Sequence, residues 1–378
     1  MRSFFWLPAV LLFWISAASV AWGQTGYEQL LKLAEDGDAA AQLELGDMYR
    51  KQVGTLSGDT VAVNWYSKSA KKGNATAQCN LAYMYENGYG TGKDDKEAVK
   101  WYRKSAKQDF ARAQCGLGFM YENGRGVDTD AEEALKWYRL SAENKYPIAY
   151  LNLGRMYEKG IGVQKNDTTA IKWYRLAAEA ENAQAQGQLG WIYERGIGVK
   201  ADTAEALKLY KRASFNEDPS AQNNLARYYY FGLGGIKKDY KSAAELFHKA
   251  AKGGNTLAQY TLAQMHETGV GADVEKDHHE ALELYLQAAG KGHKGALFRA
   301  GRMYYYGMGT EKNMPVAAYY YGMAADQGEL YAAGSLGIML YEGQGIEKDT
   351  AKGLVLLRKA ANAGIKEVKE YMTAHNLQ

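Results

Sequence analysis

The sequence predicts an all-α solenoid built from about nine helix hairpins, and three observations support this fold class. A phrase that begins Ala77-Gln-Cys-Asn-Leu-Ala-Tyr-Met-Tyr-Glu-Asn-Gly-Tyr-Gly returns from Ala113, Ala149, Ala185 and Ala221, each time after 36 residues. A period of this length is typical of arrays in which each repeat buries its apolar face only against its neighbours. Each repeat also contains two stretches with apolar residues at helical spacing, and only 4 of the 378 residues are proline.

Residues 1–23 precede the repeats and are predicted to form a secretory signal peptide. Arg2 comes before an apolar stretch from Phe4 to Ile15, and small residues then offer cleavage after Ala21 or Gly23. The stretch is shorter than the roughly 20 apolar residues that span a bilayer. Its length therefore favours a signal peptide over the alternative, an uncleaved membrane anchor. We expect a periplasmic or secreted protein, with no stable membrane insertion after signal cleavage and residues 24–378 as one solenoid.

Each repeat reads as one helix hairpin when its leading alanine is numbered position zero. In the repeat from Ala113, positions four, five, seven and eight fall on one face of a first helix, and a Gly-x-Gly turn at 124–126 ends it. Asp130 and Glu133 then have the spacing of a capping box, and a second apolar face follows over residues 134–142 at intervals of three and four. The pattern therefore predicts two antiparallel helices per repeat.

Both ends of the array differ from the repeats, which run from about 41 to 367. Tyr27 to Glu35 is predicted as an unpaired second helix before the first repeat, and Lys366 to His375 as a polar closing helix. The first repeat keeps both helices but has an irregular loop around Gln52 to Thr60. Such terminal helices are expected to cap the exposed ends of a repeat array.

The repeat pattern resembles the Sel-1-like repeat family, a relative of the tetratricopeptide repeats, over residues 41–364. Its clearest stretches are Leu-Gly-Arg-Met-Tyr-Glu-Lys-Gly-Ile-Gly-Val at 153–163 and Ala-Ile-Lys-Trp-Tyr-Arg-Leu-Ala-Ala at 170–178. Departures are local, because His266 and Leu340 replace the usual tyrosine. The resemblance implies a right-handed α-α superhelix and a role as an adaptor in protein complexes, commonly in bacterial secretion, envelope signalling or host interaction. It implies no reaction.

Positions two, six and nine of the first helices point away from the predicted core. In the related tetratricopeptide arrays this face lines the concave groove, and aromatic and arginine side chains that the core does not need are typical of binding hot spots. The alternative is that these side chains pack against neighbouring repeats. We predict a groove for a partner protein or peptide that consists of Tyr83, Phe119, Arg155, Trp191, Arg227, Tyr260, Phe298, Arg302 and Tyr305.

Cys79 and Cys115 are the only cysteines, and both occupy position two of consecutive repeats. Stacked helices lie roughly 8 to 10 Å apart, whereas a disulfide needs Cα atoms within about 7 Å. Curvature of a concave face narrows that gap, and an oxidising compartment favours the bond. The sequence leaves a disulfide and two free thiols as alternatives.

Composition and local motifs restrict the function further. The net charge of +3, from 46 basic and 43 acidic residues, gives no electrostatic case for nucleic acid as a partner. His278 and His279 are the one cluster suggestive of a metal, but the capping box explains Asp277 and Glu280 beside them. Adjacent residues on a helix also point about 100° apart. We expect no metal and no other cofactor.

An enzymatic alternative rests on Ser69 and Lys72, which have the Ser-x-x-Lys spacing of penicillin-recognising enzymes. Some members of the resembling family have been associated with β-lactam hydrolysis. However, Ser69 occupies the same core position as Ser105 and Ser141, and the accompanying motifs are missing from the sequence. We therefore expect a non-enzymatic adaptor in the bacterial envelope; the alternatives are a cell-wall or glycan-binding envelope protein and a serine hydrolase of the β-lactamase type.

Overall fold

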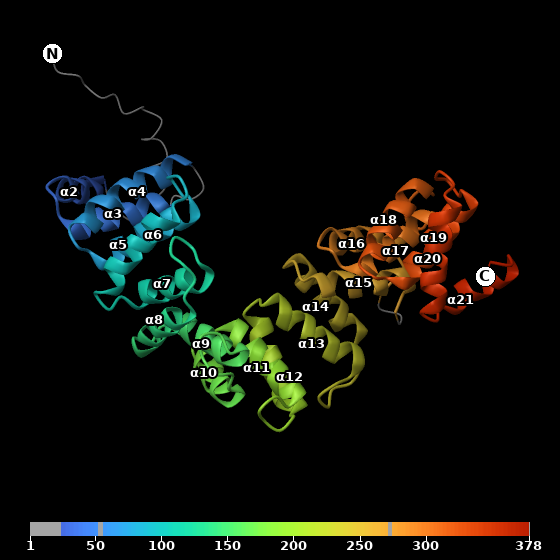
Figure 1. Ribbon diagram of the computed structural model, residues 1–378. Coiled ribbons are helices and arrows are strands. Elements are labelled where there is room, and N and C mark those ends of the chain that lie inside the picture. The colour runs from blue at the N-terminus through green and yellow to red at the C-terminus, as the bar shows by residue number, and fades with distance from the viewer. Residues whose placement is uncertain (1–23, 52–55, 271–273, 378) are drawn as a thin grey trace, which may run out of the picture. The chain divides into compact units, whose positions relative to one another are not determined.

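The computed structural model describes residues 24–51, 56–270 and 274–377, and over these ranges the chain is helical apart from loops and one isolated bridge between Val270 and Val274 (Figure 1). The predicted signal peptide lies outside the described residues. The chain forms two compact units that divide between Ala180 and Glu181. The prediction of one continuous domain over residues 24–378 stays a prediction.

The first unit contains a leading helix and four hairpins, which follow one another in chain order (Figure 1). Within each hairpin the two helices pack against each other, and each second helix also packs against the first helix of the next hairpin. The helices are α2 (Gln24–Glu35), α3 (Ala39–Lys51), α4 (Leu56–Lys71), α5 (Ala75–Asn87), α6 (Asp95–Ala106), α7 (Ala111–Asn123), α8 (Ala131–Glu143), α9 (Pro147–Lys159) and α10 (Asp167–Glu179).

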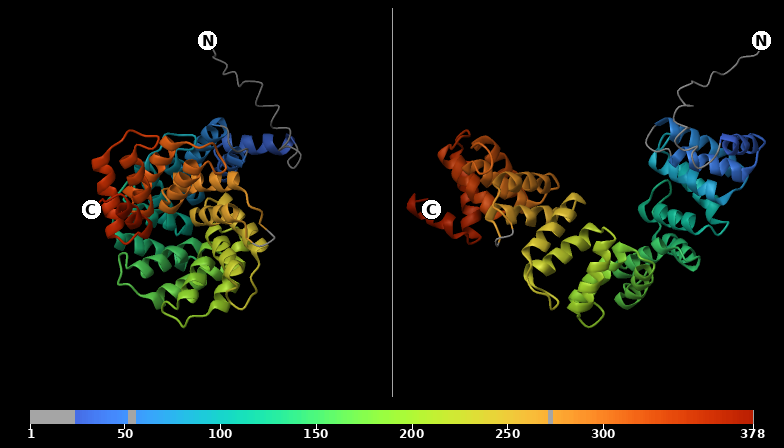
Figure 2. Two further views of the ribbon diagram at one scale, coloured as in Figure 1. Left: turned by 90° about the vertical axis from the view of Figure 1, so that its right-hand side faces the viewer. Right: turned by 180° about the vertical axis from the view of Figure 1, so that it is seen from behind.

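The second unit contains five hairpins and a shorter final helix in the same scheme, and the views in Figure 2 show its hairpins in the same order. Its helices are α11 (Ala183–Arg195), α12 (Thr203–Phe215), α13 (Pro219–Phe231), α14 (Tyr240–Lys252), α15 (Thr256–Thr268), α16 (His278–Gly290), α17 (Lys294–Tyr306), α18 (Met314–Asp326), α19 (Leu330–Glu342), α20 (Thr350–Asn362) and α21 (Lys366–Ala374).

The predicted caps start the second helices, although only half of each capping box forms. The Asp94 carboxylate accepts the backbone N–H groups of Lys96 and Glu97 at 3.0 Å each. The Glu97 side chain pairs with Lys100 at 2.8 Å, and the backbone N–H of Asp94 donates to the carbonyl of Tyr85 at 2.9 Å. In a complete capping box the glutamate side chain would accept the backbone N–H of Asp94. Here the carbonyl of Tyr85 on the first helix accepts it instead.

Small residues and tyrosines interlock inside each hairpin. A Cβ atom added to Gly118 on α7 would lie 2.8 Å from the ring of Tyr138 on α8, so only glycine leaves room for that ring. Tyr138 is fully buried, as are its equivalents Tyr66 and Tyr210. The tyrosine excess of the sequence is thus largely structural at these positions.

A buried glutamine at position one joins consecutive hairpins. Gln78 donates from Nε2 to the carbonyl of Ala70 at 3.0 Å, and Gln114 donates to the carbonyl of Ala106 at 3.3 Å. These carbonyls lie in the last turn of the preceding second helix, and each also accepts a backbone N–H from the turn that follows, that of Gly73 or Asp109 at 3.1 Å. The glutamine of each of these repeats therefore binds the C-terminal end of the second helix of the preceding repeat.

The structure confirms the predicted fold class, an all-α solenoid of helix hairpins. Both predicted terminal helices are present, as α2 and α21. None of the helices in the described ranges is long and apolar enough to cross a membrane.

Candidate partner-binding surface

Within each unit, position six of the first helices forms the most open strip of the predicted surface. Phe119 is 37% exposed and Trp191 is 36% exposed. The Arg155 and Arg227 side chains at the same position are 36% and 39% exposed. These four side chains are available to a partner from rigid helical positions.

Position two does not face outward as predicted. Cys79, Cys115 and Asn223 are buried, with exposures of 0%, 6% and 5%. Cys115 accepts a hydrogen bond from Asn152 of the next repeat at 3.6 Å. The helical wheel of a single helix misses this burial, because contacts with the next repeat, such as that of Cys115 with Asn152, are not part of one helix.

Position nine is also occupied within the array. Its glutamates accept hydrogen bonds from the buried second-helix tyrosine of the same repeat, at 2.6 to 2.9 Å. The pairs are Glu86–Tyr102, Glu122–Tyr138, Glu158–Tyr174, Glu194–Tyr210 and Glu267–Tyr285. Burial, followed by the adjacent carboxylate, raises the pKa of Tyr102 and Tyr138 well above the ordinary value, so these hydroxyls stay protonated and donate.

Arginines from the following repeat complete the environment of these glutamates. Arg155 lies 2.6 Å from Glu122, and Arg227 lies 3.2 Å from Glu194. Both arginines were predicted as groove residues, and both also hold adjacent repeats together. Their exposure leaves part of each guanidinium open to a partner. At these two positions, packing between repeats is therefore compatible with binding of a partner.

In the first unit the predicted aromatic residues are accompanied by arginines. The guanidinium carbons of Arg50 and Arg112 lie 4.9 and 5.6 Å from the ring centre of Tyr83. The guanidinium of Arg125 lies 5.7 Å from the ring of Phe119. These distances are within the range of cation–π attraction.

In the second unit the structure brings Phe298 and Tyr305 together around Tyr321, at ring separations of 5.8 and 6.4 Å. Tyr260 lies apart from them and packs on His293 at 4.4 Å. Arg302 on α17 is half-buried. Phe298 also lies 6.1 Å from Tyr331 of the next repeat, and the Tyr305 hydroxyl donates to Gln344 of the next repeat at 2.8 Å. These two side chains therefore also pack between repeats, as the packing alternative predicts.

Arg50, Arg112, Tyr306 and Tyr331 belong to this surface but were not predicted. Arg50 occupies position nine of the first repeat, where the next four repeats have glutamate, and this exchange of charge is a signal in the sequence. Tyr306 and Tyr331 are 62% and 51% exposed. They lie outside positions two, six and nine, so the single-helix wheel did not select them.

Cys79 and Cys115 are both free thiols in the structure. Burial raises the pKa of Cys79 to about 11 and that of Cys115 to about 12. Both thiols are therefore protonated at neutral pH, and their reactivity is low.

Ser69 and Lys72 are engaged in structural hydrogen bonds. The Ser69 hydroxyl is fully buried and donates to the carbonyl of Ala39 at 2.6 Å, and Ser105 makes the equivalent bond to Ala75 at 2.7 Å. Lys72 donates to the carbonyl of Gly37 rather than to Ser69. Neither residue is arranged as a nucleophile with its base.

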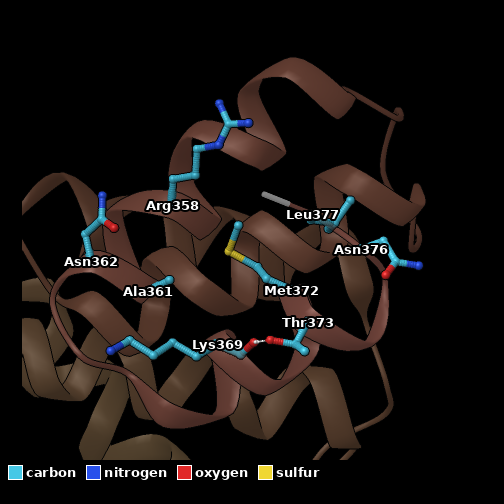
Figure 3. Close-up of a pocket in the computed structure, with 8 residues that line it drawn as sticks. All are labelled: Arg358, Ala361, Asn362, Lys369, Met372, Thr373, Asn376 and Leu377. Carbon is cyan, nitrogen blue, oxygen red and sulfur yellow. Dashed lines mark hydrogen bonds between the residues drawn. The ribbon is translucent and has the colours of Figure 1, made fainter.

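Two further candidate ligand sites are the histidine pair at the start of α16 and a cavity near the end of the described chain. In the described ranges, no three His, Cys, Asp or Glu side chains are grouped as metal ligands, and Asp277 caps α16 by accepting from His279 and Glu280. A cavity of about 560 Å³ lies between α20 and α21 (Figure 3). Its lining residues are Arg358, Ala361, Asn362, Lys369, Met372, Thr373, Asn376 and Leu377.

Comparison with known proteins identifies this repeat. The model of the family described as Sel1 repeat matches nine segments, at residues 39–74, 75–110, 111–146, 147–182, 183–214, 219–255, 256–293, 295–329 and 330–365. No curated protein matches the chain in sequence.

Two solved structures resemble the chain over most of its length. One is a protective antigen of uropathogenic Escherichia coli strains with an SLR fold: it is 30% identical, the match covers 93% of this chain and 91% of the other, and the TM-score is 0.53. The second is a Sel1 repeat protein from Oxalobacter formigenes: it is 28% identical, the match covers 82% and 89% of the two chains, and the TM-score is 0.59.

Proposed function

Because this chain belongs to the Sel1 repeat family, whose members generally mediate protein–protein interactions, we propose that it is a non-enzymatic adaptor of the bacterial envelope. The partner is a protein or a peptide segment. It binds along the first helices, over the strip at position six. Such a role suits a repeat array, which offers an extended surface.

The exposed aromatic residues at position six are the observation that supports this proposal most. Phe119 and Trp191 each keep more than a third of their surface open, whereas Cys115, at position two of the same repeat as Phe119, is only 6% exposed. Large aromatic side chains on rigid elements bury much area at little entropic cost when a partner binds.

The location in the envelope rests on the N-terminal sequence and on one relative. Residues 1–23 have the pattern of a signal peptide, and the similar E. coli protein is a protective antigen. N-terminal sequencing of the protein from a periplasmic or culture fraction is expected to start at Trp22 or Gln24. A chain that keeps Met1 and sediments with membranes would refute the cleavage.

Site-specific photo-crosslinking tests the surface. A photoreactive residue replaces Phe119 or Trp191 in the native envelope, and a matched control replaces Phe215, which is 87% exposed and lies at the end of α12. We expect the two strip positions to yield one shared crosslinked protein that the control does not yield. Adducts from all three positions alike, or from none, would contradict binding at the strip.

A further inference from the structure

Two arginines of the first unit converge on one aromatic ring of the proposed surface. Arg50 comes from α3, Arg112 from α7, and Tyr83 from α5 between them. The two guanidinium carbons lie 4.9 and 5.6 Å from the ring centre. All three side chains are half-buried. Three consecutive first helices thus bring two positive charges to one place.

Two carboxylates of the repeats that contain Arg50 and Tyr83 already have other partners. Asp47 accepts from the Tyr66 hydroxyl at 2.6 Å and from Asn80 at 3.2 Å. Glu86 accepts from Tyr102 at 2.7 Å and pairs with Arg125 at 2.9 Å.

Over the described part of the first unit, no carboxylate oxygen lies within 4.0 Å of the guanidinium nitrogens of Arg50 or Arg112. Both arginines make polar contacts with neutral groups. Arg50 interacts with the Tyr66 hydroxyl, and Arg112 donates to Asn80 at 3.2 Å. Cys79 beside Arg112 is also neutral, because burial raises its pKa to about 11.

This situation differs from that of two other arginines of the first unit. Arg125 and Arg155 each have a glutamate of the preceding repeat as a partner. Two half-buried guanidinium groups without a carboxylate are electrostatically complementary to an anion. A carboxylate that reaches either guanidinium beside the Tyr83 ring would gain charge-assisted hydrogen bonds that solvent screens only in part.

We propose that Arg50, Arg112 and Tyr83 form a carboxylate-binding site, which selects partner segments with an acidic residue. An apolar side chain next to that residue packs on Tyr83 and Phe119. The inference rests on the proposed function, since it names the chemistry of the peptide that the strip binds. The carboxylate is either an Asp or Glu side chain or the C-terminus of the peptide.

A random peptide library displayed on phage tests the proposal with the full mature chain. The library is selected in parallel on the unaltered protein, on the double variant Arg50→Gln and Arg112→Gln, and on Arg195→Gln. Arg195 is an exposed arginine at the end of α11 and serves as the matched control. Peptides from the unaltered protein and the control should be enriched in Asp and Glu next to an apolar residue, and those from the double variant should lose this enrichment.

The outcomes separate this proposal from the function on which it rests. Enriched peptides without acidic residues, or equal acidic enrichment on the double variant, would overturn the carboxylate site and keep peptide binding. No enriched peptide on any of the three proteins would overturn both.

Synthetic versions of the best peptide give a test that needs no protein variant and holds even if the double variant does not fold. Replacing its acidic residue by the amide should weaken binding to the unaltered protein by about tenfold or more. Peptides with a free or an amidated C-terminus distinguish the two sources of the carboxylate. Equal affinity of the acidic, amide and amidated forms would overturn the site.

Discussion

At the scale of single residues, Tyr228 is the clearest exception to the repeat. It occupies position seven, where most repeats have methionine, and it is fully buried. Its hydroxyl has no hydrogen-bond partner among the described residues. A buried polar group without a partner reduces the stability of the folded state.

We therefore expect Tyr228→Phe to stabilise the protein by about 1 kcal/mol. The matched variant is Tyr210→Phe, because Tyr210 is equally buried and its ring lies 5.5 Å from that of Tyr228. The Tyr210 hydroxyl donates to Glu194 at 2.8 Å, so its removal should destabilise the protein by about 1 to 2 kcal/mol. Chemical denaturation measures both values, and two variants that shift in the same direction would contradict the assignment.

Arg125 forms ion pairs with two carboxylates of the preceding repeat. It pairs with Asp95 at 2.6 Å and with Glu86 at 2.9 Å. The hydrogen bond from Arg125 holds the pKa of Asp95 below its ordinary value. A carboxyl group with a lowered pKa in the folded state stabilises the fold above its unfolded pKa of about 3.9, and the effect is lost as the pH falls through the folded value.

Arg125→Gln should accordingly lower the free energy of unfolding by about 1 to 2 kcal/mol near neutral pH. Near about pH 3 the difference from the unaltered protein should shrink, because Asp95 then takes up a proton. Lys136→Gln is the control: its exposed pair with Glu133 should contribute little at either pH. A difference that is constant with pH would show that Arg125 acts through packing alone.

At the scale of elements, the helices were predictable because their signals are local. Glycine turns, capping aspartates and apolar spacing within one repeat define where α7 and α8 begin and end, and the structure agrees with them. The second half of the capping box was wrong, because Glu97 pairs with Lys100 while the backbone of Tyr85 satisfies Asp94. That bond links two helices of a hairpin, which one-helix reasoning does not include.

The candidate site was predictable only along its centre. Position six lies opposite the core of its own hairpin, so the helical wheel located Phe119 and Trp191 correctly as exposed. Position two failed at Cys79 and Cys115, because their burial depends on the neighbouring repeats. Arg112 was missed for the same reason, since it meets Tyr83 only after the repeats stack.

The second glycine of each Gly-x-Gly turn connects elements of consecutive repeats. Gly126 has φ +70°, and a Cβ atom there would lie 2.2 Å from the carbonyl oxygen of Asp95 at the start of α6. The turn after α7 therefore lies directly on the backbone of the preceding repeat. Both the positive φ and the close approach require glycine.

Gly126→Ala should destabilise the protein by about 2 to 4 kcal/mol, since the two backbones must separate and the left-handed conformation is strained. Gly92 is the matched control, because a Cβ atom there meets nothing within 4 Å. Gly92→Ala should change the stability by less than about 0.5 kcal/mol. Thermal or urea unfolding followed by circular dichroism measures both, and equal effects would refute the role of the close approach.

At the scale of the whole molecule, each hairpin depends on its neighbours, and the ends depend on caps. Val368 and Met372 on α21 are buried against Leu357 and Ala360 on α20. At the other end, Leu30 and Ala34 on α2 pack on the first hairpin. In such an array the stability is approximately a sum of the repeats and of the interfaces between adjacent repeats. Damage to one cap should therefore stay local.

Val368→Asp places a charge in the buried face of α21 and is expected to detach this helix from α20. Hydrogen exchange should then become faster by at least about tenfold in α19 and α20, whose outer face loses its cover. The amides of α3 to α9 should keep their protection, because α21 packs on α20 within the second unit. Glu370→Ala, an exposed change in the same helix, should alter neither region. Uniformly faster exchange along the chain would show instead that the hairpins unfold as a single cooperative body. The stability of the partner-binding surface would then depend on the whole array and not only on the adjacent repeats.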